Sequence, residues 1–179
     1  SPTVFKDVHN FSEVHPLMRS WTLWYTKPDK VSAETYADNI SEVVTFDTVE
    51  AFWGMYNNII PVSDLPLRAD YGLFEKGVRP EWEHPANSKG AKWTVQFKGR
   101  TDYLNEKWLN VLLALIGETL DAEESSEITG VVFNCRKAGN RFAVWTRSTD
   151  NDRALMEIGY KIREIVGPGE TIEFSKHDA

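Results

Sequence analysis

The sequence predicts an α+β fold, in which a mostly antiparallel sheet carries helices on one face. Three observations support this prediction. Short stretches alternate apolar and polar residues, as strands do, and longer stretches fit helices. Hairpins and loops join the strands, which is typical of antiparallel pairing. The chain has 179 residues, enough for one domain with a substantial core.

The strand prediction is clearest in RSWTLWYT (19–26), where Trp21, Leu23 and Tyr25 alternate with Thr22, Trp24 and Thr26. A hairpin is predicted around KAGN (137–140). The other predicted strands are 41–46, 71–74, 91–97, 129–136, 141–147 and 171–175.

Helices are predicted over 47–59, 101–118 and 151–167. In the first, we expect Asp47 to be the N-cap, with Glu50 in capping-box position. The second has a core stripe of Leu104, Trp108, Val111, Leu112 and Leu115. It also carries Leu109, Leu113 and Ile116, so that its apolar arc covers more than half the circumference. On the residues alone, an arc this wide favours a helix buried on two sides.

Composition limits the function classes. The formal net charge is −7, which argues against a broad basic surface for a long nucleic acid, although a few arginines could still bind one small anion. Cys135 is the only cysteine, as expected in a reducing compartment such as the cytosol. No apolar run is long enough to span a membrane, and SPTVFKDV at the start is not a signal pattern. Because the chain starts without methionine, we expect a fragment of a longer one.

Two arginines flank the hairpin turn. The turn 137–140 predicts Arg136 opposite Arg141, with Asn134 and Trp145 on the same face of the sheet. One interpretation is an exposed hairpin end, where the like charges point apart into water. The other is a site in which the two guanidinium groups hold an anion such as phosphate.

Two aromatic residues, Trp82 and Tyr36, lie in loops and outside any periodic apolar pattern. Such rings either fold back over the core, which is commoner, or stack on a flat ligand. Glu83 follows Trp82 directly, and a carboxylate can accept both the N1–H and N2–H of guanine while the neighbouring ring covers the base. The alternative for Glu83 is a loop carboxylate in water.

The sequence contains no pattern of catalytic residues. Its four histidines, at positions 9, 15, 84 and 177, have neither metal nor triad spacing. We see no glycine-rich phosphate loop and no nucleophile elbow. We therefore expect no enzyme, no metal and no cofactor.

Several blocks resemble one known family. HPLMRSWTLWYTKP, FDTVEAFW, VRPEWE, GAKW, LLALIGE and NCRKAGNRFAVWT resemble eukaryotic translation initiation factor 4E, which binds the messenger-RNA cap, and several look like fungal versions. The likeness runs in order from about His15 to Phe174. It implies a cupped antiparallel sheet with three helices on its convex face. We expect an N-terminal arm (1–14) and one cap-binding domain (15–179) with a truncated C-terminal tail.

The ligand implied by the resemblance is 7-methylguanosine triphosphate at the mRNA 5′ end. Trp82 would stack on one side of the base, Glu83 would read the guanine edge and Trp145 would contact the methyl group. The other stacking residue falls on Tyr36, where the family usually has tryptophan. The implied phosphate-binding residues are Arg136, Arg141 and Lys92.

Tyrosine attracts a cationic base less strongly than tryptophan does, so we expect somewhat lower cap affinity. A protein-interaction adaptor or repressor-type homologue with weakened cap binding therefore remains an alternative function. An enzyme acting on the cap is a third.

The resemblance also implies a partner surface on the convex side, in place of a helix buried on both sides. It would receive a short helix from scaffold initiation factor 4G or from 4E-binding repressor proteins. Trp53 is the expected hot spot, and Asn110 stands where many members have glutamate. We expect a monomer in the cytoplasm, with the nucleus as a second location. The implied contact residues are His15, Pro16, Val49, Trp53, Leu109, Leu113 and Gly117.

Overall fold

The computed structural model describes residues 14–28, 39–98, 102–121 and 127–177. Its seven strands form one sheet in the order β2-β1-β3-β5-β6-β4-β7, and every neighbouring pair is antiparallel, as predicted. The strands are β1 (Pro16–Thr26), β2 (Ile40–Thr48), β3 (Asp70–Glu75), β4 (Ala91–Gln96), β5 (Ile128–Asn134), β6 (Arg141–Thr146) and β7 (Thr171–Lys176).

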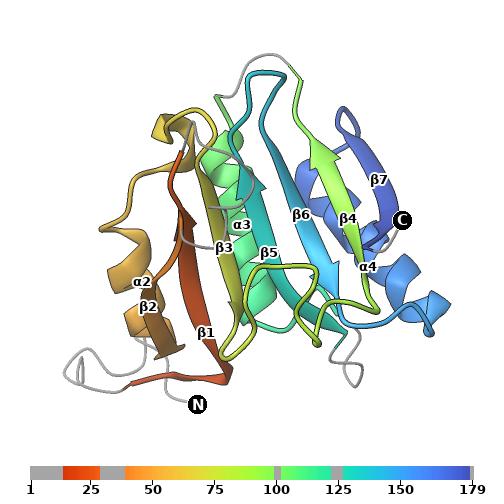
Figure 1. The fold of residues 1–179 in the computed structure, drawn as a ribbon, viewed down its shortest axis with the longest axis horizontal. Helices are drawn as coiled ribbons and strands as arrows, with labels where there is room; N and C mark the ends of the chain where they lie inside the picture. The colour runs from red at the N-terminus through yellow and green to blue at the C-terminus, as the bar shows by residue number, and fades with distance from the viewer. Residues whose placement is uncertain (1–13, 29–38, 99–101, 122–126, 178–179) are drawn as a thin grey trace, which may run out of the picture.

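Three α-helices accompany the sheet in the described part of the chain: α2 (Val49–Tyr56), α3 (Leu104–Ile116) and α4 (Asp152–Val166), besides a short 3-10 helix, η2 (Val62–Asp64). Figure 1 shows the helices behind the curved sheet, while the β3–β4 connection crosses in front of it. We call these two sides the helix face and the front face. None of the described helices has the length and apolarity needed to cross a membrane.

Strand alternation assigns each residue to a face. Leu73, Val131 and Val144 occupy paired positions on β3, β5 and β6, and all three belong to the core beneath the helices. Their neighbours Phe74 and Trp145 point the other way and belong to a small second cluster on the front face. The polar and charged side chains of the front face therefore lie mostly outside the main core.

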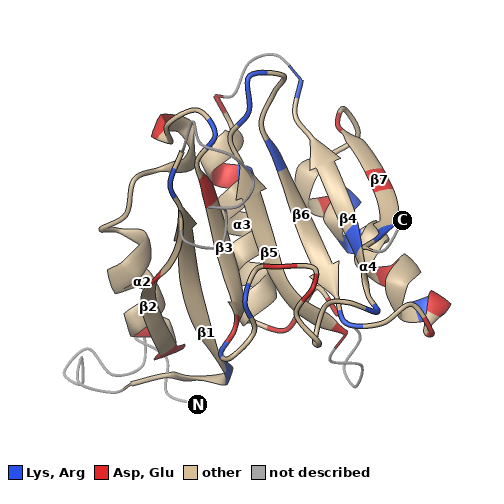
Figure 2. Ribbon diagram, in the orientation of Figure 1, with Lys and Arg blue, Asp and Glu red and all other residues tan. Residues whose placement is uncertain are grey.

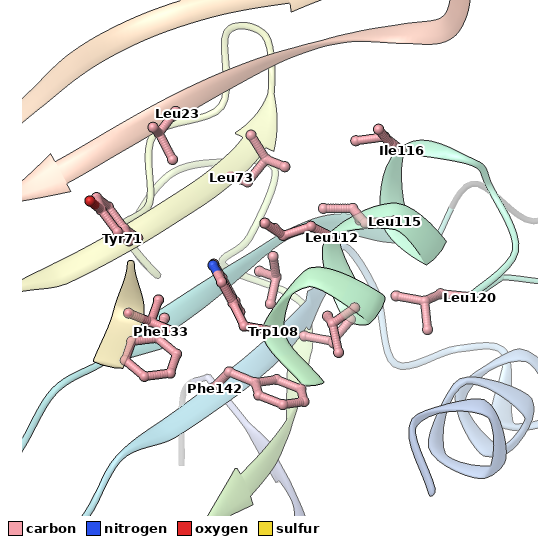
Figure 3. Close-up of a cluster of buried hydrophobic side chains, with 14 of the residues drawn as sticks. Leu23, Tyr71, Leu73, Trp108, Leu112, Leu115, Ile116, Leu120, Phe133 and Phe142 are labelled. Atoms are coloured by element: carbon pink, nitrogen blue, oxygen red, sulfur yellow. The ribbon is translucent and has the colours of Figure 1, made fainter. Parts of the chain in front are cut away.

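Helix α3 closes the main core. Figure 3 shows its Trp108 among the rings of β5 and β6, with ring centroids 5.4 Å from Phe133 and 6.3 Å from Phe142. The whole predicted stripe is buried: Leu104, Trp108, Val111, Leu112 and Leu115. Helical periodicity alone thus identified the side of α3 that faces the sheet.

The start of α2 differs from the prediction. Strand β2 continues to Thr48, so Asp47 lies in the strand, and Thr48 is the N-cap, with its hydroxyl accepting from the Ala51 N–H at 3.0 Å. Glu50 does not close a capping box. Its carboxylate instead accepts from the backbone N–H and the ring Nδ1 of His15. The prediction of Asp47 as N-cap was wrong because the strand runs two residues further than its apolar pattern.

We expect Thr48→Ala to lower the free energy of unfolding by about 1 kcal/mol, since the first turn of α2 loses its side-chain acceptor. Asp47→Ala is the matched control, and it should change stability by less than about 0.5 kcal/mol because Asp47 is exposed. Urea unfolding of both variants measures the difference. A larger loss from Asp47→Ala than from Thr48→Ala would contradict the cap assignment.

Candidate functional site

Trp145 of β6 forms the floor of the front face. Its ring meets the edge of Phe74 at a centroid distance of 5.3 Å and an interplanar angle of 83°, and it lies 4.5 Å from the His177 ring. Phe74 in turn lies across Gly130, where an added Cβ would come within 2.4 Å of the Phe74 ring. Trp145 is half-buried, so one part of its ring is held and another part remains accessible.

The connection between β3 and β4, residues 76–90, carries the adjacent residues Trp82 and Glu83. Trp82 is 48% exposed and Glu83 is also exposed, so neither folds back over the core. The loop is attached on both sides of them. Val78 is buried in the front-face cluster, and Ala86 packs against that cluster, to which Trp145 also belongs.

A buried amide fixes the shape of this loop. Asn87 is 0% exposed, and its Nδ2 donates to the carbonyl oxygens of Arg79 (3.1 Å) and Glu81 (2.9 Å). Its Oδ1 accepts from the Thr129 hydroxyl of β5 at 2.7 Å. Gly90 ends the loop so close to β6 that an added Cβ would lie 1.7 Å from the Thr146 carbonyl oxygen. Hydrogen bonds and close packing thus hold in place the loop that carries the exposed Trp82.

The hairpin register differs from the prediction. Arg141 pairs with Asn134, so the connection spans 135–140 and Arg136 lies outside the strand, not opposite Arg141. The physical reason is that residues 135 and 136 bend toward β3. There the guanidinium of Arg136 donates to both carboxylate oxygens of Asp70, at 2.7 and 3.2 Å.

Asp70 links the two sides of this hairpin. It is 4% exposed, and it also accepts from the Asn134 side chain at 2.8 Å, while the Arg141 Nε donates to Asn134 Oδ1 at 3.3 Å. Arg136 therefore does not point away into water. It is neutralised by Asp70, and two of its five N–H groups are left for another acceptor.

Two further cations on the front face lack such a partner. Lys92 of β4 is paired across the sheet with Trp145, and Arg141 with Gln96. In the described part of the chain, neither Lys92 nor Arg141 forms an ion pair with a carboxylate. Burial and then the nearby charge of Arg141 lower the pKa of Lys92. Two uncompensated cations on adjacent strands favour the binding of an anionic ligand on this face.

The structure thus brings Trp145, Lys92, Arg141 and Arg136 to one face, with Trp82 and Glu83 on the loop that crosses it. Tyr36 lies outside the described residues. Sequence reasoning missed Asp70 and Asn87. The sequence could have indicated Asp70, because alternation along β3 puts it on the same face as Asn134. Nothing in the sequence indicated the role of Asn87.

The opposite side of the sheet carries the predicted partner residues. Val49 and Trp53 lie on α2, Leu109 and Leu113 lie on α3, and both helices pack on the same core. Trp53 is 36% exposed although its ring lies 5.3 Å from Phe52. Leu109 and Leu113 are only half-buried, so the helix is not enclosed on two sides, while Ile116 belongs to the core.

His15 and Pro16, at the start of β1, contact the residues where α2 begins. The Val49 N–H donates to the His15 carbonyl at 2.9 Å, and Pro16 pairs with Thr48. Hydrogen bonds, first from the His15 ring and then from backbone N–H groups, lower the pKa of Glu50 from 4.5 to about 2. Gly117, the last of the predicted partner residues, is the C-cap of α3. An added Cβ at this position would lie 2.9 Å from the Leu113 carbonyl oxygen.

Within the described residues, no group of three or more histidine, cysteine, aspartate or glutamate side chains is placed to hold a metal ion. Cys135 is partly buried, and burial raises the pKa of its thiol. Its Sγ lies 3.5 Å from the Leu65 carbonyl oxygen. A raised pKa disfavours the thiolate that nucleophilic chemistry needs.

Comparison with known proteins agrees with this geometry. The family model described as "Eukaryotic initiation factor 4E" matches residues 16–179. Initiation factor 4E of Candida glabrata is 46% identical, covering 98% of this chain and 84% of the relative, and factor 4E-1 of Schizosaccharomyces pombe is 48% identical, covering 98% and 81%. The solved complex of Caenorhabditis elegans eIF4E-3 with the 4E-binding protein Mextli and a cap analog is similar at a TM-score of 0.85 and 34% identity, covering 93% of this chain and 94% of that one. The chain belongs to the eukaryotic initiation factor 4E family.

Proposed function

We propose that this protein binds the 7-methylguanosine triphosphate cap of mRNA on its front face and recruits scaffold initiation factor 4G through its helix face. Relatives that carry the same fold include one solved with a cap analog and a 4E-binding protein together. The observation that carries the proposal is the exposed Trp82–Glu83 pair, held in front of the sheet by the buried Asn87 and accompanied by Trp145 and uncompensated cations.

The protein would recognise the base through its positive charge and through the hydrogen-bond donors along its edge. Methylation at N7 makes guanine cationic, and a cation against an aromatic face gains about 0.5–2 kcal/mol when desolvated. Trp82 supplies one such face, and Tyr36 supplies the other. Glu83 accepts hydrogen bonds from the guanine N1–H and N2–H, and the accessible part of Trp145 contacts the methyl group.

The triphosphate would leave the base toward the hairpin. Arg141 and Lys92 offer uncompensated positive charge on adjacent strands, and Arg136 offers its two remaining N–H groups. Because Asp70 already neutralises Arg136, this arginine is held in position before ligand arrives and adds directional hydrogen bonds more than net charge.

The helix face would take a short amphipathic helix from factor 4G or from a 4E-binding repressor. Trp53 is the central contact, with the half-buried Leu109 and Leu113 beside the path of that helix. Asn110 is exposed on α3, and since it is neutral it offers an arginine of the partner a hydrogen bond rather than an ion pair.

We further propose a binding protein without catalysis, located in the cytoplasm. Tryptophan quenching by the cap analogue with no release of phosphate supports binding, whereas released phosphate would show an enzyme. Immunofluorescence of the tagged chain tests the location, and a strictly nuclear signal would contradict it. An adaptor with weakened cap binding, the second candidate, is favoured only by tyrosine at position 36.

Glu83→Ala should weaken binding of 7-methyl-GTP about ten- to a hundredfold, because a charge-assisted hydrogen bond contributes roughly 1.5–3 kcal/mol. Intrinsic tryptophan fluorescence measures the affinity. Glu164→Ala, which removes an equal charge from an exposed position on α4, is the matched control and should bind as the wild type does. Undiminished affinity in Glu83→Ala would remove this residue from the site.

Tyr36→Ala should release 7-methyl-GTP faster, since one of the two aromatic faces is lost, and Tyr36→Trp should release it more slowly. Stopped-flow fluorescence gives both dissociation rates. If the three proteins dissociate at the same rate, the ring at position 36 does not stack on the base.

Trp53→Ala should weaken binding of a 4E-binding helical peptide by about 2 kcal/mol or more, or at least about thirtyfold, because a central buried tryptophan dominates contacts of this type. Its affinity for 7-methyl-GTP should stay unchanged, since the cap site lies on the opposite face. Tyr160→Ala, an exposed aromatic on α4, is the control. Calorimetric titration with equal peptide affinity in all three proteins would refute the assigned surface.

A further inference from the structure

His84 lies in the β3–β4 connection directly after Glu83, and the proposed cap site does not use it. Its backbone begins a turn, because its carbonyl oxygen accepts from the N–H groups of Asn87 (2.8 Å) and Ser88 (2.9 Å). Its side chain is half-buried, and the ring Nδ1 lies 3.1 Å from the backbone N of Ala86. His84 therefore supports this turn through both its main chain and its ring.

The direction of the hydrogen bond to the ring defines the protonation state that this turn needs. A backbone N–H can only donate, so Nδ1 of His84 is the acceptor and must keep a lone pair. A neutral imidazole offers that lone pair with its proton on Nε2, whereas an imidazolium donates from both nitrogens. The ring thus acts as serine, threonine, aspartate and asparagine side chains do when they cap the first turn of a helix. Pro85 follows, and proline is common directly after such a cap because it has no N–H to satisfy.

The turn that His84 caps attaches the loop to the rest of the front face. Ala86, whose N–H the ring accepts, packs against the front-face cluster to which Trp145 also belongs. Asn87, whose N–H the His84 carbonyl accepts, is the buried amide that binds the Glu81 carbonyl at 2.9 Å. Loss of the ring acceptor would therefore loosen both attachments at once.

Trp82 and Glu83 lie inside the span that these attachments close. The His84 N–H donates to the Glu81 carbonyl at 3.2 Å, so residues 81–84 form a tight turn of their own. The two side chains assigned to the cap base are the central residues of that turn. Their directions therefore depend on how firmly His84 is held.

Ionisable groups near His84 come from the loop and from the elements around it. Figure 2 shows both basic and acidic segments along the β3–β4 connection. Two ion pairs engage some of them, Arg79 with Glu81 at 3.3 Å and Glu75 with Arg147 at 2.9 Å. Within the described residues, no carboxylate forms an ion pair with His84. The loop contributes Arg79, Glu81, Glu83 and Lys89, and the surrounding elements contribute Glu75, Lys92, Arg147 and His177.

We propose that His84 is a positioning residue of the cap site, whose neutral ring holds Trp82 and Glu83 in the conformation that binds 7-methylguanine by accepting the Ala86 N–H. Protonation of the ring removes this acceptor and turns a donor toward the Ala86 N–H. Because imidazoles take up this proton between about pH 5 and 8, cap binding weakens as the pH falls through that range. The inference rests on the proposed cap site.

The test measures binding of the cap dinucleotide m7GpppG at about pH 7.0 and about pH 5.5 by intrinsic tryptophan fluorescence. This ligand is chosen over 7-methyl-GTP because it has no terminal phosphate monoester, whose own proton would titrate in the same range. Wild type should bind about three- to tenfold more weakly at the lower pH, which is the loss expected when one capping acceptor is removed. Carboxylates in general remain mostly ionised at about pH 5.5, so they do not produce this change.

Two substitutions at this position separate the capping role from the charge. His84→Asn keeps a side-chain acceptor suited to such a turn but does not titrate, so it should bind m7GpppG as wild type does at about pH 7.0 and keep that affinity at about pH 5.5. His84→Ala has neither the acceptor nor the proton, so it should bind about three- to tenfold more weakly than wild type at both pH values. His177→Asn is the control for the second imidazole near Trp145, and it should retain the pH dependence of wild type.

Equal affinity of wild type at both pH values would overturn the proposal. Tighter binding at the lower pH would also overturn it, because attraction between the imidazolium and the triphosphate would then prevail. A loss at low pH that persists in His84→Asn or disappears in His177→Asn would contradict the assignment to His84, as would full affinity of His84→Ala at about pH 7.0. If wild type does not bind m7GpppG at either pH, the proposed cap site itself fails, and this inference fails with it.

Discussion

The two-sided nature of the sheet is the constraint on which the rest of this structure depends. Helices cover one face through a dense aromatic and aliphatic core in which Trp108 meets Phe133 and Phe142. Since side chains alternate along a strand, every position that packs under a helix commits its neighbours to the opposite face. Trp145, Lys92 and Arg141 are such neighbours. Good packing behind the sheet therefore determines which residues can act in front of it.

The arrangement of charges on the front face explains how an acidic protein can bind an anionic ligand. The chain carries a net charge of −7. Near the hairpin, however, the Asp70–Arg136 pair is the only ion pair between a cation and a carboxylate in the described residues. Local arrangement, rather than total charge, controls the potential that a small ligand meets within a Debye length. Long-range repulsion from the rest of the surface then disfavours extended nonspecific contact with nucleic acid.

Sequence periodicity predicted the strands and helices well, because apolar burial leaves a local pattern. It placed all five stripe residues of α3 correctly, and it gave the all-antiparallel pairing in outline. It failed where the decisive partner is distant in the chain. Arg136 is bound to a carboxylate 66 positions away, and Asn87 to a hydroxyl 42 positions away. The N-cap was missed for a different reason, since Thr48 serves a strand and a helix at once. The prediction for Tyr36 lies outside the described residues.

Gly90 has a consequence for how the loop tolerates change. The hydrogen on its α-carbon faces the Thr146 carbonyl, with no room for a methyl group. Trp145 immediately precedes that carbonyl in β6, and the Trp82 loop ends at Gly90 itself, so a bulkier residue would wedge apart the two elements that each carry an indole. Even a conservative exchange to alanine would therefore push the end of the Trp82 loop away from β6 and displace Trp82 relative to Trp145.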